Sequence, residues 1–157
     1  MIEHPFAGSA LCKVDTAGRW ALPVFVRHTL ARRGDAGFLL VAAHAIDPCL
    51  TAYDRGLVPI LHAEAERRRI AEEAVAPQAH YARGRLIFGF VEEVAIGNGG
   101  AVALPALMRR RAGLGGVVLI VAAGAAFDIW DPQRALARGD PDLRELAAWH
   151  LEVQQAA

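Results

Sequence analysis

Short apolar runs separated by glycine- and proline-containing turns mark the first third of the chain. In chain order they predict a strand at 9–14, a short strand at 19–22, a helix at 24–33, and strands at 38–43 and 50–53. Turn residues at 15–18 join the first two strands, which predicts a hairpin there. Pro23 suits the first position of the helix because its missing N–H would be unpaired there, and Gly34 suits the helix end.

The same order of elements returns in the second half of the chain. The predicted elements there are strands at 92–96, 101–104, 117–121 and 127–130, with a short helix from Pro105 between the second and third. Helices are predicted between the halves at 57–73 and 78–88, and after them at 132–137 and 140–154. Matching elements in matching order indicate an internal duplication.

One segment of the repeat keeps its turn glycine and its ending in both copies but carries charges only in the first. Asp15-Thr-Ala-Gly-Arg-Trp-Ala-Leu-Pro23 returns 82 positions later as Gly97-Asn-Gly-Gly-Ala-Val-Ala-Leu-Pro105. Asp15 and Arg19 are replaced there by Gly97 and Ala101, whereas the turn glycine and the Ala-Leu-Pro ending are kept. The shared positions therefore indicate folding, and the charged pair of the first copy indicates function.

Composition and charge narrow the classes of protein that fit. A hydrophobic share of 54% argues against disorder, yet no apolar run reaches the roughly 18–20 residues of a membrane span. The N-terminal residues lack a basic stretch followed by an apolar one, so no signal peptide is expected and cytoplasmic residence follows.

Cys12 and Cys49 are expected to be buried and unpaired. A net charge of zero gives no general signal of nucleic-acid binding, so such a role must rest on local charge.

Catalytic and metal-binding patterns are not found. The six histidines are scattered, no serine or cysteine lies in a recognisable nucleophile motif, and no cofactor or metal is implied. The glycine-rich residues 97–100 lack the Lys-Ser/Thr of a phosphate-binding loop and lie between strands. The chain is therefore not expected to be an enzyme or to take a small-molecule substrate.

The roles of two basic runs and of several large apolar residues are less clear from the sequence. Residues 67–69 lie among glutamates, which favours ion pairs on a solvated helix face, whereas residues 109–111 favour a structural role over DNA contact. Trp20, Trp149, Leu146 and Leu151 are either core residues or an apolar surface that favours oligomerisation.

The order of these motifs resembles the MraZ family of the AbrB/SpoVT swapped-hairpin transcription factors. Its most specific parts are the Asp-x-x-Gly-Arg-x-x-x-Pro segment and the ending Phe127-Asp-Ile-Trp-Asp-Pro132, within a similarity that covers residues 9–136. The resemblance implies a β-rich α+β fold: two tandem swapped-hairpin units that form an intramolecular pseudo-dimeric β-barrel. It places the first repeat at 1–56, a helical linker at 57–90, the second repeat at 91–138 and a C-terminal helix and tail at 139–157.

The same resemblance implies a function and its residues. It implies a nucleoid-associated ring of identical subunits that binds direct repeats in double-stranded DNA, upstream of the division and cell-wall gene cluster, with Asp15 and Arg19 as the DNA-contacting motif. Lys13 is a candidate phosphate contact. Alternatively, Asp15 and Arg19 form only a surface ion pair. The second copy lacks both charges, so a protein-interaction or antitoxin-like module without specific DNA binding is the other interpretation.

Overall fold

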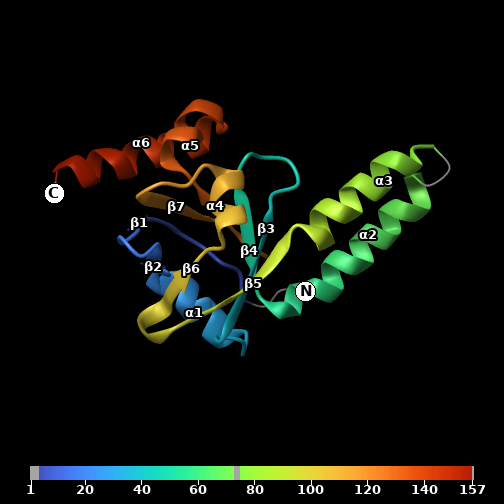
Figure 1. Ribbon diagram of the computed structural model, residues 1–157, viewed down its shortest axis with the longest axis horizontal. Helices are drawn as coiled ribbons and strands as arrows, with labels where there is room; N and C mark the ends of the chain where they lie inside the picture. The colour runs from blue at the N-terminus through green and yellow to red at the C-terminus, as the bar shows by residue number, and fades with distance from the viewer. Residues whose placement is uncertain (1–3, 73–74, 157) are drawn as a thin grey trace.

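The computed structural model describes residues 4–72 and 75–156, and its elements follow the predicted order (Figure 1). The first half comprises β1 (Ser9–Lys13), β2 (Arg19–Ala21), α1 (Val24–Arg32), β3 (Phe38–Ala43), β4 (Leu50–Tyr53) and the 3₁₀ turn η1 (Arg55–Leu57). The second half comprises β5 (Val91–Ala95), the 3₁₀ turn η3 (Asn98–Gly100), β6 (Ala101–Ala103), α4 (Ala106–Ala112), β7 (Val117–Ala122), β8 (Phe127–Trp130), α5 (Pro132–Arg138) and α6 (Pro141–Ala156). Between them lie α2 (Val58–Glu72), α3 (Pro77–Gly84) and the π-helical turn η2 (Arg85–Gly89).

The strands that flank each turn pair with strands of the other half instead of with each other. A six-stranded antiparallel sheet has the order β1-β7-β8-β4-β3-β5, and β2 pairs with β6 in a separate two-stranded ribbon. The prediction that residues 9–14 and 19–22 form a hairpin is therefore wrong in its pairing, since β1 pairs with β7 and β2 with β6. The strands make an α+β fold with an open sheet edged by β1 and β5, and the described strands do not close into the expected barrel.

The pairing follows the internal repeat. Exchanging each strand with its equivalent in the other half leaves the order of the six-stranded sheet unchanged. In the ribbon, Trp20 lies opposite Val102, and these two residues occupy the same position of the two copies. The halves are thus related by an approximate twofold axis that passes through the β2–β6 ribbon.

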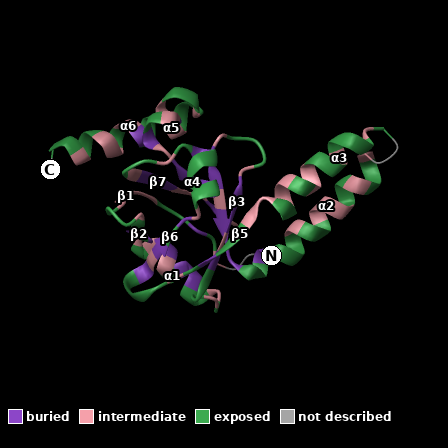
Figure 2. Cartoon of the chain, in the orientation of Figure 1, coloured by how far each residue is buried: buried purple, intermediate pink, exposed green. Residues whose placement is uncertain are grey.

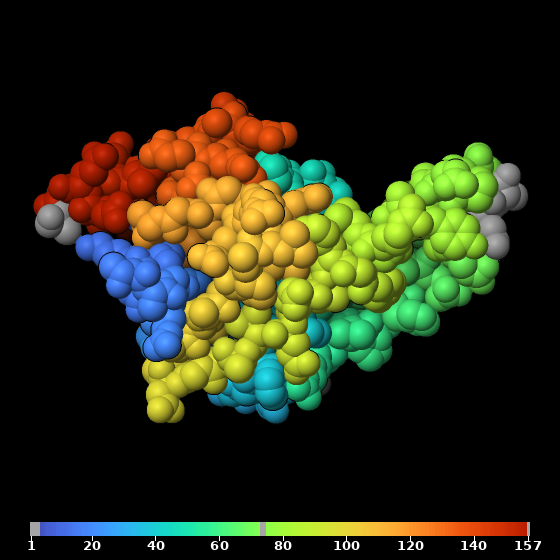
Figure 3. All heavy atoms as spheres, in the orientation of Figure 1, coloured from blue at the N-terminus to red at the C-terminus, as the bar shows by residue number. Residues whose placement is uncertain are grey.

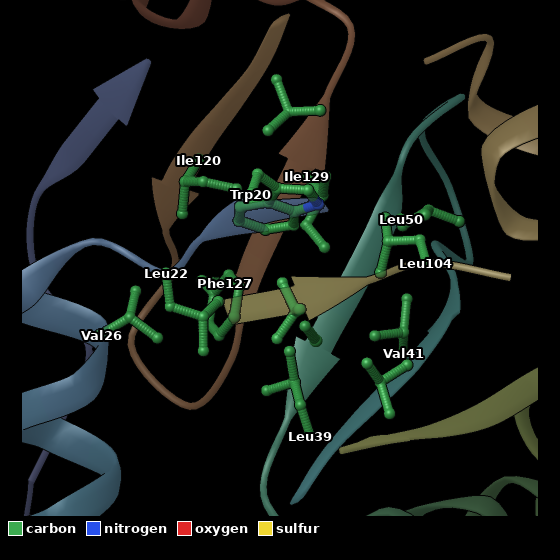
Figure 4. Packing of buried hydrophobic residues seen from close by; sticks show 14 of the residues in the cluster. Trp20, Leu22, Val26, Leu39, Val41, Leu50, Leu104, Ile120, Phe127 and Ile129 are labelled. Carbon is green, nitrogen blue, oxygen red and sulfur yellow. The ribbon is translucent and has the colours of Figure 1, made fainter. Parts of the chain in front are cut away.

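The main core fills the space between one face of the large sheet and the β2–β6 ribbon with α1 and α4 (Figure 4). Alternate residues of the strands, such as Leu39, Val41, Ile120 and Ile129, point into this space because successive side chains of a strand face opposite ways. Trp20 lies at the centre of this core and is only 4% exposed, so it contributes no exposed aromatic surface.

The other face of the sheet is covered at its two ends by the helices that follow each half. Near one end α5 and α6 pack on Leu119 and Trp130, and near the other η1 and α2 pack on Ala42 and Tyr53. Figure 2 shows that buried residues concentrate in the strands, whereas α2 and α3 contain none. No helix in the described ranges is long and apolar enough to span a bilayer.

The segments α2 and α3 form a helical hairpin, called the arm below, that projects from the body (Figures 1 and 3). Ion pairs of Arg68 with Glu64 and of Arg69 with Glu66 lie along α2, which confirms the pairing expected for this basic run. Arg83 of α3 pairs with Glu72 at the end of α2 and joins the two helices.

A buried arginine just after α1, Arg33, connects the two halves. The guanidinium of Arg33 donates to Asp54 Oδ1 at 2.8 Å, and the two side chains are only 9% and 6% exposed. The same guanidinium donates to the carbonyls of His4, Gly124 and Ala125 and lies 4.3 Å from the centre of the Phe6 ring. Asp54 belongs to the first half and Gly124 to the second, so Arg33 fixes one half against the other.

Candidate functional site

The first turn, residues 15–18, is held rigid by the side chain of Asp15. Asp15 Oδ1 accepts hydrogen bonds from the backbone N–H of Ala17 at 2.8 Å and of Arg19 at 2.9 Å. The main chain adds bonds from Asp15 N–H to the Arg19 carbonyl and from Gly18 N–H to the Asp15 carbonyl. Gly18 has a φ of +79°, which a side chain would disfavour. The carboxylate therefore orders the loop amides.

Two cations next to this turn face solvent. Lys13 ends β1 and Arg19 begins β2, and both side chains are exposed. Arg19 makes no ion pair or hydrogen bond through its guanidinium within the described ranges, so the predicted alternative of an Asp15–Arg19 surface ion pair is not what the geometry shows. Its five N–H donors are free for an external acceptor.

The second turn, residues 97–100, has the same backbone without the carboxylate. Gly97 N–H donates to the Ala101 carbonyl at 2.8 Å and Gly100 N–H to the Gly97 carbonyl at 3.1 Å, which reproduces the two main-chain bonds of the first turn. Gly100 has the same φ of +79° as Gly18. The scaffold is thus common to both turns, and the side-chain acceptor and the exposed arginine belong to the first alone.

The sequence did not indicate that Arg109 reaches the first turn. A Cβ placed on Gly18 would lie 3.6 Å from Arg109 Nη1, which brings a cation of α4 beside the Asp15–Arg19 loop. Arg111, in the same basic run, lies instead 5.0 Å from the centre of the Phe90 ring. The run is therefore divided between the turn and the body. The only sequence feature that could have pointed to Arg109 is the repeat spacing, which makes it the counterpart of Arg27 on α1.

A histidine, a cysteine and an aspartate that sequence spacing left apart meet on the face of the sheet opposite the main core. His44, Cys49 and Asp128 each offer one ligand atom within 4.8 Å of the others. His44 Nδ1 accepts from the N–H groups of Ile46 and Asp47, so the ring proton is on Nε2, which lies 3.9 Å from Asp128 Oδ1. A metal at Nε2 would require that proton to move to Nδ1, against two N–H donors. The two N–H groups that donate to Nδ1 therefore disfavour a metal ion at this cluster.

Burial raises the pKa of two groups in this cluster, Asp128 and Cys49. It raises the pKa of Asp128 to about 6, against the opposing effect of His44. The thiol pKa of Cys49 is also raised, by burial and by the nearby carboxylates of Asp128 and Asp47. Burial raises the pKa of the other thiol, Cys12, to about 11. Both cysteines are free, and their protonated thiols suit packing better than nucleophilic chemistry.

An apolar groove of about 340 Å³ runs between α2 and the sheet. Alanines of β3 and of the β7–β8 loop line it with Tyr53, Leu57 and Leu61, and Glu64 and Arg68 lie at its edge. Its lining offers few polar groups to orient a small molecule.

The relatives found by comparison with known proteins share one name. No family model matches the chain. The chain is 31% identical over 140 residues to the transcriptional regulator MraZ of Bordetella pertussis, covering 89% of this chain and 92% of that protein. It is 29% identical to the transcriptional regulators MraZ of Pseudomonas syringae pv. syringae, over 88% of this chain and 87% of that protein, and of Coxiella burnetii, over 90% and 99%.

Proposed function

Because this chain belongs to the MraZ family, we propose that it is a sequence-specific DNA-binding regulator of transcription that acts as a ring-shaped homo-oligomer. We further propose that its targets are direct repeats upstream of the division and cell-wall gene cluster, and that it is associated with the nucleoid. Within the chain, residues 1–56 and 91–138 would be the two swapped-hairpin units, with 57–90 as linker and 139–157 as C-terminal segment.

The observation that carries the proposal is the free arginine on a rigid turn. Asp15 satisfies two loop amides instead of pairing with Arg19, so the turn is ordered while the guanidinium stays exposed. A planar guanidinium held at a tight turn matches O6 and N7 of guanine or a phosphate group. Lys13, at the end of the adjoining strand, is suited to a phosphate contact.

Self-association would compensate for a small contact surface. One chain has a single turn with an intact charged motif and no net charge, which supports only modest affinity. A ring presents many copies of the first turn, and linked contacts raise the overall affinity without any new interaction. The exposed apolar side chains of the arm and of α6, among them Ile70, Tyr81 and Trp149, support such an assembly.

The test is direct binding to DNA that lies just upstream of the gene for this chain. Tiled fragments of that DNA, titrated by fluorescence anisotropy, should include one that binds far more tightly than a shuffled fragment of equal length. Its affinity should fall steeply between roughly 50 and 200 mM salt, because each phosphate contact contributes about −0.9 to the slope of log K against log salt. Absence of binding to every fragment at the lowest salt would refute the proposal.

The oligomer is tested separately by light scattering. The ring requires a mass that is a multiple of the 16.8 kDa chain and at least three chains. Such an assembly without DNA binding would favour the alternative function, an oligomeric protein-interaction or antitoxin-like module, for which the exposed apolar side chains of the arm are the supporting observation.

A further inference from the structure

The second turn lacks its own arginine but is not without a cation. Arg27, on α1 of the first half, extends across to the second turn, where a Cβ placed on Gly100 would lie 2.5 Å from Arg27 Cδ and 3.0 Å from its Nε. Glycine is therefore required at position 100 twice over, for its positive φ and for the space that Arg27 occupies.

The guanidinium of Arg27 lacks an internal partner. Its Nε is buried and makes no hydrogen bond, and no ion pair of Arg27 is found in the ranges 4–72 and 75–156. Burying a charged donor without a partner is costly, so an internal structural role leaves this arrangement unexplained. The terminal N–H groups of Arg27 also make no hydrogen bond within the described ranges, and Arg27 is only partly buried, so these groups rather than Nε would meet an acceptor placed over the second turn.

The internal repeat keeps this arginine in both copies. Arg27 and Arg109 occupy equivalent positions on α1 and α4, and each lies beside the turn of the opposite half. Asp15 and Arg19 have no such counterparts, since the second copy has Gly97 and Ala101. Both turns lie at the end of the molecule opposite the arm (Figure 1). The helix arginine is thus the positive charge that the two turns share.

We infer that Arg27 makes the second turn a phosphate-contacting element of the nucleic-acid surface. The inference rests on the proposed DNA binding and extends it to a part of the chain whose own sequence has lost the charged motif. Arg27 would hold a backbone phosphate over the glycine-rich turn and set the register of the chain on DNA, while base contacts remain with Arg19. Arg109 would do the same at the first turn.

The experiment measures the salt dependence of binding to the upstream fragment that the unmodified chain binds. Arg27→Gln keeps most of the side-chain stem over Gly100 and removes the charge. We expect several-fold weaker binding at 100 mM salt and a salt slope that is smaller by about 0.9 for each phosphate that the variant no longer neutralises. Arg27→Lys should keep most of the slope. The matched control is Arg32→Gln, which removes an exposed charge from the same helix and should leave the slope unchanged.

A second variant avoids any dependence on the packing of Arg27. Asn98 is exposed at the tip of the second turn, and Asn98→Glu would place a carboxylate against the phosphate, so we expect about tenfold weaker binding. Its control is Gln78→Glu, an exposed position on the arm, which should bind as the unmodified chain does.

The outcomes separate this inference from the proposed function. Binding that depends on Arg19 but is unchanged by both Arg27→Gln and Asn98→Glu would overturn the inference alone. Failure of the unmodified chain to bind DNA would overturn the proposed function and the inference with it.

Discussion

Replacing Arg33 with methionine tests how the halves are held together. The substitution keeps an apolar stem beside Phe6 but removes four hydrogen bonds. One of these bonds is to Asp54, and the side chains of both residues are less than 10% exposed. The carboxylate of Asp54 would be left buried without its cation, and breaking such a pair from one side costs about 3–5 kcal/mol. We therefore expect the free energy of unfolding to fall by that amount.

The measurement is urea unfolding at fixed protein concentration, since self-association shifts the apparent stability. The matched control is Arg55→Met, which breaks a 2.6 Å ion pair with Glu93 whose side chains are 56% and 50% exposed, and which should cost about 0–1 kcal/mol. The double variant Arg33→Met with Asp54→Asn should lose less than the sum of the single losses, because the second change removes the stranded charge. A loss for Arg33→Met no larger than that for Arg55→Met would show that the buried bonds of Arg33 contribute no more than an exposed ion pair.

Two further predictions concern the carboxyl groups. Asp15→Ala leaves two loop amides without an acceptor, so we expect it to lower the free energy of unfolding by about 1 kcal/mol and to weaken DNA binding. Thr16→Ala in the same exposed turn is the control and should change neither quantity. Equal effects of the two substitutions would contradict the role of Asp15. Folding raises the pKa of Asp128 from 3.8 to about 6, so the folded state favours the protonated carboxyl group. Its contribution to the free energy of unfolding is therefore present below about pH 4 and is lost as the pH rises through 6. Asp128→Asn should therefore raise the melting temperature more at pH 7.5 than at pH 4, and thermal melts that show the same shift at both values would count against it.

The order and bounds of the elements could be read from the sequence because they depend on local patterns. The strands at 38–43, 50–53 and 127–130 agree with the predicted ranges, and most other ends differ by one or two residues. Alternating apolar residues, turn glycines and helix-starting prolines act over a few residues, so their signal is contained in the segment itself.

Pairing between the halves could not be read in the same way. The turn at 15–18 gives a local signal for a hairpin, yet β1 pairs with β7, more than a hundred residues away. That choice depends on which strands bury the most apolar surface together, and Trp20 shows the effect: its strand pairs with β6, which encloses the ring in the core instead of exposing it.

The candidate site was predictable where it lies in one segment. Asp15 and Arg19 stand in one motif, although the structure was needed to show that Asp15 accepts from two loop amides instead of pairing with Arg19. Arg27 and Arg109 approach turns that are far away in the sequence, so only the repeat spacing linked them. The meeting of His44 with Asp128 likewise depends on the β3–β4 and β4–β8 pairings.

The proposed contact between Arg19 of the first turn and DNA is tested by comparing Arg19→Ala with the unmodified chain on the bound upstream fragment. Circular dichroism and light scattering should show the same fold and mass for both, because the Arg19 side chain is exposed to solvent. We expect Arg19→Ala to abolish the preference for that fragment over a shuffled one. Retention of the full preference by a folded Arg19→Ala chain would contradict the proposed contact.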